Sequence, residues 1–225
     1  MRTVDLVDEY PSFINLIEKD TEIYKKFVEY LTINVSEFFR NESYWTILKD
    51  KIIPDLLKNK QKIKIWSAGC STGEEPYSLA ILMKEYFDSK SDIILATDID
   101  QEVLDRSSKG LYGAKAIESV GNDFKRDLAK YFIKEENSYR AQNDIRKLIT
   151  FKKHDLLKDN FDSNFDLILC RNVVIYFTEE AKTKLYEKFA KSLNLGGVLF
   201  VGNTEQIFQT KELGLKTVST FFYKK

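Results

Sequence analysis

The spacing of hydrophobic and polar positions changes near residue 60 of the chain. Before that point, apolar residues such as Ile23, Phe27 and Tyr30 recur at three- and four-residue steps with charges between them. This is the periodicity of amphipathic helices. The same spacing between Tyr44 and Leu57 predicts a further helix. We therefore expect a short helical region over residues 1–58.

From there on, short apolar runs alternate with helical stretches. The predicted strands are Ile63–Ser67, Ile93–Thr97, Phe165–Cys170 and Val198–Val201, and the predicted helices are Glu75–Phe87, Gln101–Lys109 and Glu179–Leu193. Such alternation predicts a parallel sheet in an α/β, doubly wound fold. A β-branched and aromatic run from Thr217 to Tyr223 predicts an antiparallel last strand.

The alternation stops between Leu111 and His154. This segment contains one short predicted helix, Asn122–Tyr131, and β-prone pieces around Phe132, Tyr139 and Ile149, separated by polar turns. We expect a small antiparallel β subdomain inserted at about residues 111–153. The main domain around it then covers residues 59–225.

The first predicted strand runs into the loop segment IWSAGCSTGEEPYS, Ile65 to Ser78. Gly69 and Gly73 lack side chains that would keep a ligand from the backbone, and the next helix presents its N-terminal amides there. Glu74 and Glu75 argue against phosphate, because an anion cradle would carry Lys or Arg. They would face a pyrophosphate, which excludes a dinucleotide-dependent dehydrogenase. S-adenosylmethionine (SAM), with hydroxyls, a cationic sulfonium and no phosphate, suits these carboxylates.

Asp98 follows the second predicted strand. In doubly wound sheets, ligands bind outside the carboxyl ends of the strands, and an acid after the second strand accepts hydrogen bonds from ribose hydroxyls. We therefore predict that Asp98 binds the ribose. The glycine-containing loop and this acid lie on successive strand–helix units, and together they predict a nucleoside cofactor site.

Five segments in a fixed order carry a specific resemblance. They are TINVSEFFR (Thr32–Arg40), GCSTGEEPYS, ATDID, CRNVVIYF (Cys170–Phe177) and GNTE (Gly202–Glu205). From about Leu31 onward, the chain resembles the chemotaxis receptor methyltransferases, CheR. The resemblance implies a class I SAM-dependent methyltransferase that forms methyl esters on glutamates in the cytoplasmic helices of bacterial chemoreceptors. Composition and periodicity alone indicate only a SAM-type α/β enzyme.

The resemblance also assigns site residues. Ser36 stands where many members have threonine and keeps the hydroxyl, although Ser36 is also a good helix N-cap. Asp155 stands where the family often has an asparagine that contacts adenine; an aspartate can accept a hydrogen bond but cannot donate one. The predicted cofactor-binding residues are Asn34, Ser36, Arg40, Gly69, Glu74, Glu75, Asp98, Asp155, Leu156, Arg171 and Asn172. Gly202 to Glu205 is expected to be loop architecture near the site.

The implied chemistry needs no general base, because a glutamate is already ionised at neutral pH. The enzyme must align carboxylate oxygen, methyl carbon and sulfur, and remove water from a weak nucleophile. A basic group or a hydroxyl near the methyl would do this, and we predict that Arg40 and Tyr176 are the catalytic residues. The alternative for Arg40 is an ordinary surface arginine at a helix end. The alternative for Tyr176 is ordinary aromatic core packing.

Composition limits the partners. With 35 basic and 35 acidic residues the formal net charge is +0, so no global field attracts nucleic acid. Cys70 and Cys170 fall in predicted strand or strand-end segments, which argues against a disulfide framework. We assign no metal ligands. The absence of a spanning hydrophobic run or a signal-peptide core predicts a cytoplasmic protein without membrane insertion, which we expect to be a monomer.

The N-terminal region departs from the family pattern. It is shorter than the helical domain that precedes the TINV motif in the resembled enzymes, and it is rich in acids such as Asp5, Asp8 and Glu9. Two alternatives therefore stay open: SAM-dependent methylation of another acceptor, and a non-catalytic module that binds SAM or a receptor. In the resembled family, the inserted subdomain can also hold the C-terminal tail of a receptor, so such a tail is a further expected partner.

Overall fold

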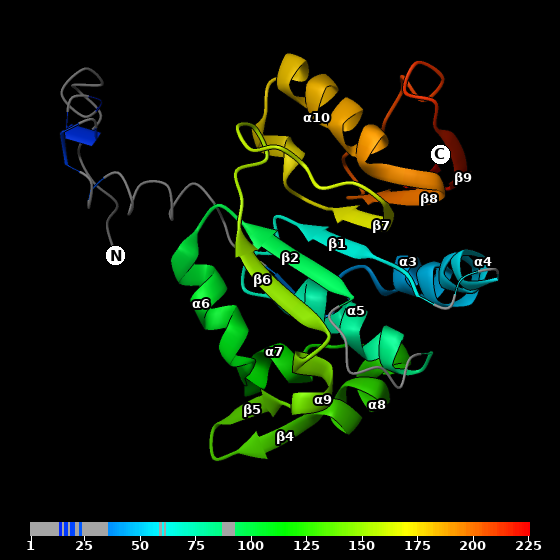
Figure 1. Ribbon diagram of the computed structural model, residues 1–225. Helices are drawn as coiled ribbons and strands as arrows, with labels where there is room; N and C mark the ends of the chain where they lie inside the picture. The colour runs from blue at the N-terminus through cyan, green and yellow to red at the C-terminus, as the bar shows by residue number, and fades with distance from the viewer. Residues whose placement is uncertain are drawn as a thin grey trace. The chain divides into compact units, whose positions relative to one another are not determined.

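The structure of the protein is a computed structural model (Figure 1). It describes residues 36–58, 60, 62–86 and 93–225, together with Ile14, Leu16, Ile17, Lys19, Asp20 and Ile23. The chain divides into two compact units, Met1–Val35 and Ser36–Lys225. In the first unit, five of the six described residues are helical. The rest of the helical prediction for this unit lies outside the described residues.

The second compact unit begins earlier than the predicted boundary at residue 58. Its first helical segment consists of α3 (Glu42–Ile47), a π-helical turn η1 (Leu48–Ile52) and α4 (Ile53–Leu57). Buried apolar side chains of this segment belong to the same core cluster as the strands, which explains why it packs with the sheet. Pro54 lacks the amide that would donate to the carbonyl of Asp50, and the helix widens into a π turn just before it.

A seven-stranded sheet with the order β6-β2-β1-β7-β8-β10-β9 forms the centre of this unit. Its strands are β1 (Ile65–Ala68), β2 (Ile94–Asp98), β6 (Ile149–Lys153), β7 (Phe165–Cys170), β8 (Leu193–Val201), β9 (Lys216–Ser219) and β10 (Phe222–Lys224). The first five strands in spatial order are parallel, whereas β10 is antiparallel to both β8 and β9. The predicted doubly wound α/β sheet with an antiparallel last strand is thus confirmed.

The predicted strand Thr217–Tyr223 is wrong in one respect, because the run is split between β9 and β10. Between them the chain turns at Phe221, whose φ of 66° is left-handed. The two pieces then pair antiparallel with each other, and β10 lies between β8 and β9. The sequence contains no glycine or proline at this turn that would have signalled it.

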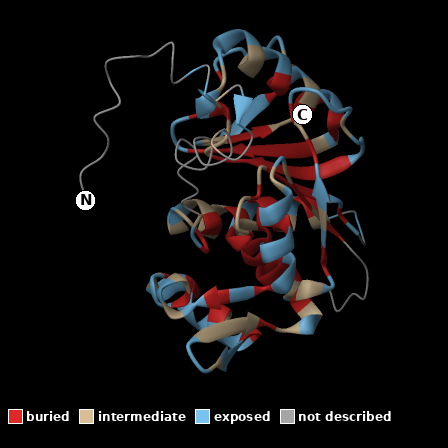
Figure 2. Cartoon of the chain, turned by 90° about the vertical axis from the view of Figure 1, so that its left-hand side faces the viewer, coloured by how far each residue is buried: buried red, intermediate tan, exposed pale blue. Residues whose placement is uncertain are grey.

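Helices cover both faces of the sheet. Successive side chains on a strand point to opposite faces. Ile65 accordingly joins a cluster with α3, α4 and α5 (Glu74–Lys84), whereas Trp66 joins a cluster with α10 (Glu179–Ser192). Strands β1 and β7, at the centre of the sheet, are buried throughout, and α5 is almost continuously buried (Figure 2). Because parallel strands end at one edge, this arrangement brings the loops after β1, β2 and β7 together.

The inserted segment forms a small sheet of its own, with the order β3-β5-β4. Its elements, with α6 before it, are α6 (Gln101–Lys109), β3 (Leu111–Gly113), α7 (Ala114–Glu118), α8 (Asn122–Tyr131), β4 (Phe132–Glu135), β5 (Ser138–Ala141) and α9 (Asn143–Arg146). The predicted insertion extended to residue 153, but Ile149–Lys153 is strand β6 of the large sheet, paired with β2. The small antiparallel sheet therefore ends at Ala141.

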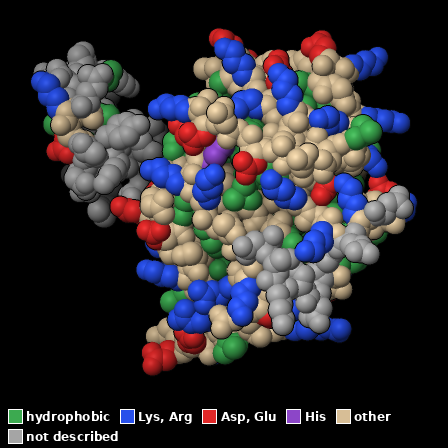
Figure 3. Space-filling view, in the orientation of Figure 1, with side chains coloured by type: hydrophobic (Ala, Val, Ile, Leu, Met, Phe, Trp, Pro, Cys, Tyr) green, Lys and Arg blue, Asp and Glu red, His purple; other side chains and the backbone are tan. Residues whose placement is uncertain are grey.

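Charged side chains of both signs are mixed over the face of the molecule seen in Figure 3. This distribution agrees with the formal net charge of +0. Among the helices that the structure describes, none has the length and apolar character needed to cross a membrane.

Candidate active site

The loop after β1 is docked against the end of β2. The amides of Gly69 and Cys70 both donate to the carbonyl of Thr97, at 2.8 Å. Gly69 has a left-handed φ of 78°, and a Cβ there would lie 2.4 Å from Cγ2 of Val173. Only glycine fits this close approach. The loop after β1 therefore touches the loop after β7, which carries the CRNVVIYF segment.

The inserted subdomain also contacts the loop after β1. Tyr112 on β3 donates its hydroxyl to the carbonyl of Thr72 at 2.9 Å. Burial raises the pKa of this phenol well above its usual value, so it remains a donor. The hydroxyl would also be 2.8 Å from a Cβ on Gly73, whose φ is 93°. A side chain at Gly73 would therefore separate the subdomain from the loop.

Asp98 ends β2 and faces the loop. Its carboxylate accepts hydrogen bonds from the amides of Ser71 at 2.8 Å and Asp100 at 3.1 Å. Burial raises the pKa of Asp98, and these backbone hydrogen bonds oppose the rise. A carboxylate has about four acceptor sites, so capacity remains for a hydroxyl-bearing ligand.

Three carboxylates create a negative potential at this loop. Burial raises the pKa of the Cys70 thiol far above its usual value, and the charges of Asp98, Glu75 and Glu74 raise it further. This potential would repel a pyrophosphate and attract a cation. The donor set thus fits SAM, whose sulfonium and amino group are positive and whose ribose donates hydroxyl hydrogen bonds.

Glu74 and Glu75 are adjacent in sequence but differ in their contacts. Glu74 accepts a hydrogen bond from the Thr72 hydroxyl at 2.6 Å. Glu75 accepts hydrogen bonds from the Ser67 hydroxyl at 2.8 Å and from Arg171 at 3.4 Å. Burial raises the pKa of Glu75, and the charge of Arg171 opposes this rise. Both oxygens of Glu75 are therefore engaged inside the protein.

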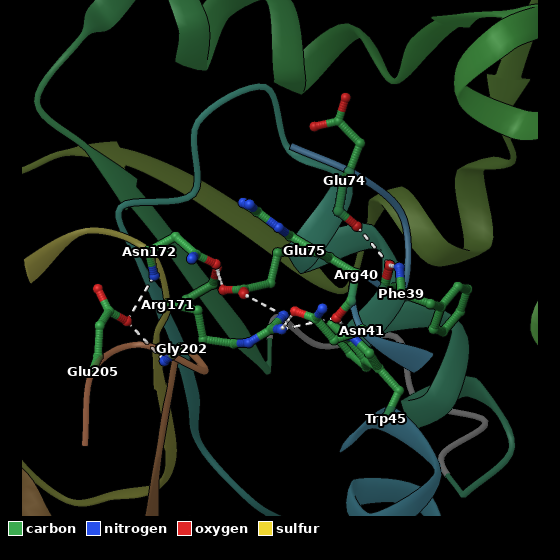
Figure 4. Close-up of polar contacts among 12 residues, drawn as sticks. Phe39, Arg40, Asn41, Trp45, Glu74, Glu75, Arg171, Asn172, Gly202 and Glu205 are labelled. Carbon is green, nitrogen blue, oxygen red and sulfur yellow. Dashed lines mark hydrogen bonds and ion pairs between the residues drawn. The ribbon is translucent and has the colours of Figure 1, made fainter. Parts of the chain in front are cut away.

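Arg171 lies inside the protein, between Glu75 and the turn formed by Arg40 and Asn41 (Figure 4). Its side chain is 3% exposed. One guanidinium nitrogen donates to the carbonyl of Arg40 at 2.8 Å and to the side chain of Asn41 at 3.3 Å. The guanidinium carbon lies 4.6 Å from the ring centre of Phe200. These contacts are internal, and direct binding of the cofactor by Arg171 stays a prediction.

Asn172 follows in a left-handed conformation, with φ of 60°. The carboxylate of Glu205 accepts from the amides of Asn172 at 2.7 Å, Gly202 at 2.7 Å and Val174 at 2.9 Å. A Cβ on Gly202 would come within 2.4 Å of this carboxylate. Glu205 thus fixes the loop after β7. Sequence reasoning treated its segment as loop architecture and missed this role; the only signal in the segment was an acid three residues after Gly202.

The two phenylalanines of the NVSEFFR motif anchor it to the inserted subdomain. Phe38 packs edge-on against Tyr112 and Phe132, with ring centres 4.8 Å and 5.2 Å apart. Phe39 stacks on Phe124 of α8 at 4.3 Å. The motif therefore depends on a segment about 80 residues away in the chain, which its own sequence does not reveal.

Arg40 lies in the turn just before α3 and is half-buried. Its carbonyl accepts from the indole of Trp45 at 3.0 Å as well as from Arg171. Figure 4 shows its side chain leaving this turn in a direction away from the Trp45 ring. Ser36 is half-buried in the preceding segment. Asn34, the other predicted residue of this motif, lies outside the described residues.

Tyr176 closes a short 3₁₀ turn, η2 (Val174–Tyr176), after β7. Its side chain is 53% exposed, so core packing does not explain this tyrosine. Phe177, in contrast, is half-buried against the core cluster on the α10 side. Tyr176 is thus available to a molecule that approaches the carboxyl edge of the sheet.

The segment after β6 lies beside Asp98, because the amide of His154 donates to the Asp98 carbonyl at 2.9 Å. The Asp155 carboxylate accepts from the amides of Leu157 at 2.9 Å and Lys158 at 3.3 Å, and so caps a turn. Leu156 is buried in the same cluster as Trp66. A contact of Asp155 or Leu156 with adenine stays a prediction. The described residues contain no cluster of three or more potential metal ligands.

Comparison with known proteins adds a family match. A family model described as CheR methyltransferase, SAM binding domain, matches residues 34–222. This range includes the strand-end loops described above and the whole of the NVSEFFR motif.

Three curated relatives resemble nearly the whole chain. A chemotaxis protein methyltransferase of Listeria innocua is 43% identical over 217 residues, which is 96% of this chain and 82% of the relative. That of Listeria monocytogenes is 42% identical, with the same coverage of both chains. That of Borreliella burgdorferi is 34% identical over 91% of this chain and 76% of the relative.

Proposed function

The chain belongs to the CheR methyltransferase family, and we propose that it transfers the methyl group of SAM to glutamate side chains of bacterial chemoreceptors. Its cofactor is SAM, and its relatives are SAM-dependent methyltransferases of chemotaxis. The proposed product on the receptor is a glutamate methyl ester. We place the reaction in the cytoplasm and expect the protein to act as a monomer.

The observation that carries the cofactor assignment to individual residues is the convergence of three acids on one glycine-containing loop. Asp98 would accept from the ribose, and Glu74 would face the positive end of the cofactor. Gly69 keeps the loop open to close approach. When bound, SAM supplies a methyl group made electrophilic by the sulfonium. The other proposed cofactor contacts are Asn34, Ser36, Arg40, Glu75, Asp155, Leu156 and Asn172.

The acceptor requires orientation rather than activation, because its carboxylate is ionised at neutral pH. We propose that Arg40 and the phenol of Tyr176 hold that carboxylate in line. Arg40 is supported by its rigidly held turn, and Tyr176 by its exposure at the carboxyl edge of the sheet. A positioned donor of this kind lowers the entropy cost of alignment and replaces lost water.

Receptor tails are a second proposed partner. In the small sheet, β3 and β4 each pair with β5 alone among the described strands, so each leaves one edge open. An extended peptide can add to such an edge through backbone hydrogen bonds.

The proposed reaction is tested by incubating the purified protein with methyl-labelled SAM and cytoplasmic fragments of chemoreceptors. We expect label to enter the receptor and to be released as methanol in mild base, as glutamate methyl esters require. A receptor fragment with glutamine at the labelled glutamates serves as the control and should stay unlabelled. Label that resists base, or a protein that binds S-adenosylhomocysteine yet labels no receptor, would contradict the proposal.

Replacing Arg40 tests its role in positioning. We expect Arg40→Ala to lower the turnover number about 10- to 100-fold, the scale of a misplaced reactant, with a much smaller change in cofactor affinity. Labelling kinetics and calorimetry with S-adenosylhomocysteine separate the two quantities. Equal losses in both would make cofactor binding, rather than positioning of the acceptor, the main role of Arg40.

A further inference from the structure

A single buried guanidinium connects the two halves of the proposed site. Arg171 reaches Glu75, at the start of α5, on one side and the carbonyl of Arg40 on the other. Glu75 continues the connection to the hydroxyl of Ser67 on β1. The cofactor loop and the turn before α3 are therefore joined through side chains that face inward (Figure 4).

The turn that carries Arg40 needs such support. Phe39 and Asn41, its neighbours on both sides, have left-handed φ values of 51° and 62°. Residues with a Cβ adopt this conformation at a free-energy cost, and it persists only where the surroundings over-determine it. The carbonyl of Arg40 lies between these two residues and accepts two hydrogen bonds, from Arg171 and from Trp45. Loss of either donor would release the turn toward ordinary conformations.

We propose that Arg171 is a positioning residue for methyl transfer, which acts by holding the backbone of Arg40 in register with the cofactor loop, with Glu75 as its counterion. This inference rests on the proposed function, in which Arg40 orients the acceptor carboxylate. It differs from the sequence-based prediction that Arg171 binds the cofactor.

The geometry suits an arginine and no other cation. The planar guanidinium directs separate N–H groups at Glu75 and at the Arg40 carbonyl, whereas a lysine ammonium is a compact charge on a flexible chain. The ring of Phe200 covers its face. Arg171→Lys therefore keeps the buried charge opposite Glu75 but weakens the bond to Arg40.

The primary experiment compares Arg171→Lys with Arg146→Lys. Arg146 on α9 is a matched control, because it is half-buried and also donates to a backbone carbonyl, that of Ser108. We expect Arg171→Lys to lower the turnover number about 10- to 100-fold and to leave affinity for S-adenosylhomocysteine within about threefold. Arg146→Lys should change neither. An unchanged turnover number, or equal losses of turnover and affinity, would overturn the proposal.

A double-mutant cycle tests whether the effect passes through Arg40. If it does, Arg171→Lys should add little to the loss already caused by Arg40→Ala, because both changes disable the same group. Independent, multiplicative losses would contradict this route. Should Arg171→Lys fail to fold, Glu75→Gln provides a second variant, which keeps an acceptor but removes the counterion. It should lower turnover with the same non-additivity.

The two tryptophans supply a readout that needs no receptor. The indole of Trp45 donates to the Arg40 carbonyl at 3.0 Å, and that of Trp66 donates to the Thr97 hydroxyl at 2.9 Å. In NMR spectra of Arg171→Lys, we expect the Trp45 indole N–H signal to shift and exchange faster, while the Trp66 signal stays in place. An unchanged Trp45 signal would contradict the inference. A shifted signal with no receptor methylation by the wild-type protein would instead contradict only the proposed function.

Discussion

At the scale of single residues, Asp98 and Glu75 are carboxyl groups whose pKa values are raised by burial in the folded protein. Their ionisation at neutral pH therefore opposes folding. The sign follows from linkage: a raised folded pKa gives stability that is present below the unfolded value and lost as the pH rises through the folded value. Ionising either group thus costs stability, as expected where buried carboxylates are kept for a site that attracts a cation.

Replacing Asp98 tests the ribose assignment. Asp98→Ala should weaken binding of S-adenosylhomocysteine by about 1–3 kcal/mol, the typical cost of losing a hydrogen bond to a charged or buried group. Calorimetric titration measures this change, and Asp105→Ala on α6 is an exposed control of the same chemistry. Unchanged affinity in a folded Asp98 variant would remove Asp98 from the site.

The raised pKa of Asp98 also predicts a pH dependence of cofactor binding. Ribose hydroxyls donate to the ionised carboxylate and so lower its pKa in the complex. Affinity for S-adenosylhomocysteine should therefore fall as the pH drops through the raised pKa of the free protein, which lies above the ordinary value of 3.8. Titrations between neutral pH and the onset of acid unfolding measure this. Asp98→Asn should remove this pH dependence of the affinity. A pH dependence that survives unchanged in Asp98→Asn would show that another group causes it.

At the scale of the secondary-structure elements, the loops after β7 and β8 are held together by one carboxylate. The buried carboxylate of Glu205 accepts hydrogen bonds from three backbone amides of these loops. Such charge-assisted hydrogen bonds replace the capping that a regular element would supply. The left-handed conformation of Asn172 is maintained by this arrangement.

Glu205→Gln should therefore destabilise the protein although it preserves shape. The amide keeps one acceptor oxygen but presents its NH₂ donor to at least one backbone N–H. We expect the free energy of unfolding to fall by about 1–3 kcal/mol, the cost of leaving buried polar groups unsatisfied. Urea unfolding measures it, with Glu212→Gln in the following loop as an exposed control. Equal unfolding free energies for the wild-type protein and Glu205→Gln would show that the bonds are replaceable.

Contact between α8 and the NVSEFFR motif gives a second prediction at this scale. Phe124→Leu removes the ring that stacks on Phe39, so we expect it to lower turnover as well as stability. Phe189→Leu on the opposite face of the sheet is the matched control, since Phe189 is equally buried. It should lower stability by a similar 1–3 kcal/mol, roughly the loss for a reduced core side chain, with turnover largely retained. Equal turnover in both variants would show that this contact of the subdomain does not contribute to catalysis.

Local signals explain why some elements are predictable from sequence. Helix α6 has the predicted bounds because the side chain of Asp100 caps its start and left-handed Gly110 ends it. Strand β6 was misplaced because its pairing with β2 is a long-range contact that its own residues do not encode. The turn at Phe221 was missed for the converse reason, since a bulky residue takes a conformation that sequence reasoning assigns to glycine.

The same distinction applies to the candidate site. Gly69 and Asp98 were predictable, because a strand followed by a specialised turn or acid marks the ligand edge of a doubly wound sheet. The inward direction of Arg171 and the triple acceptor role of Glu205 were not, because both depend on which loops meet at that edge. Sequence reasoning thus predicted at which edge of the sheet the candidate site lies, but could not separate residues available to a ligand from those that hold the loops.

At the scale of the whole molecule, ligand binding should stabilise the folded state. S-adenosylhomocysteine at 100 times its dissociation constant should add about 2.7 kcal/mol to the free energy of unfolding. Calorimetry measures the affinity, and urea unfolding measures this gain. NAD at the same concentration should have no effect, since the negative charges of Asp98, Glu75 and Glu74 gather at the loop and would repel its pyrophosphate. Stabilisation by NAD, or none by S-adenosylhomocysteine, would contradict the proposed cofactor site.

The position of β10 between β8 and β9 has a consequence for folding. The β9–β10 hairpin follows β8 in the chain, and β10 is the strand that pairs with the outer edge of β8. Any partly folded state in which this hairpin is detached leaves that edge of the parallel strands bare, and a bare edge invites pairing with other chains. Aggregation during refolding should therefore depend on how quickly the hairpin docks against β8.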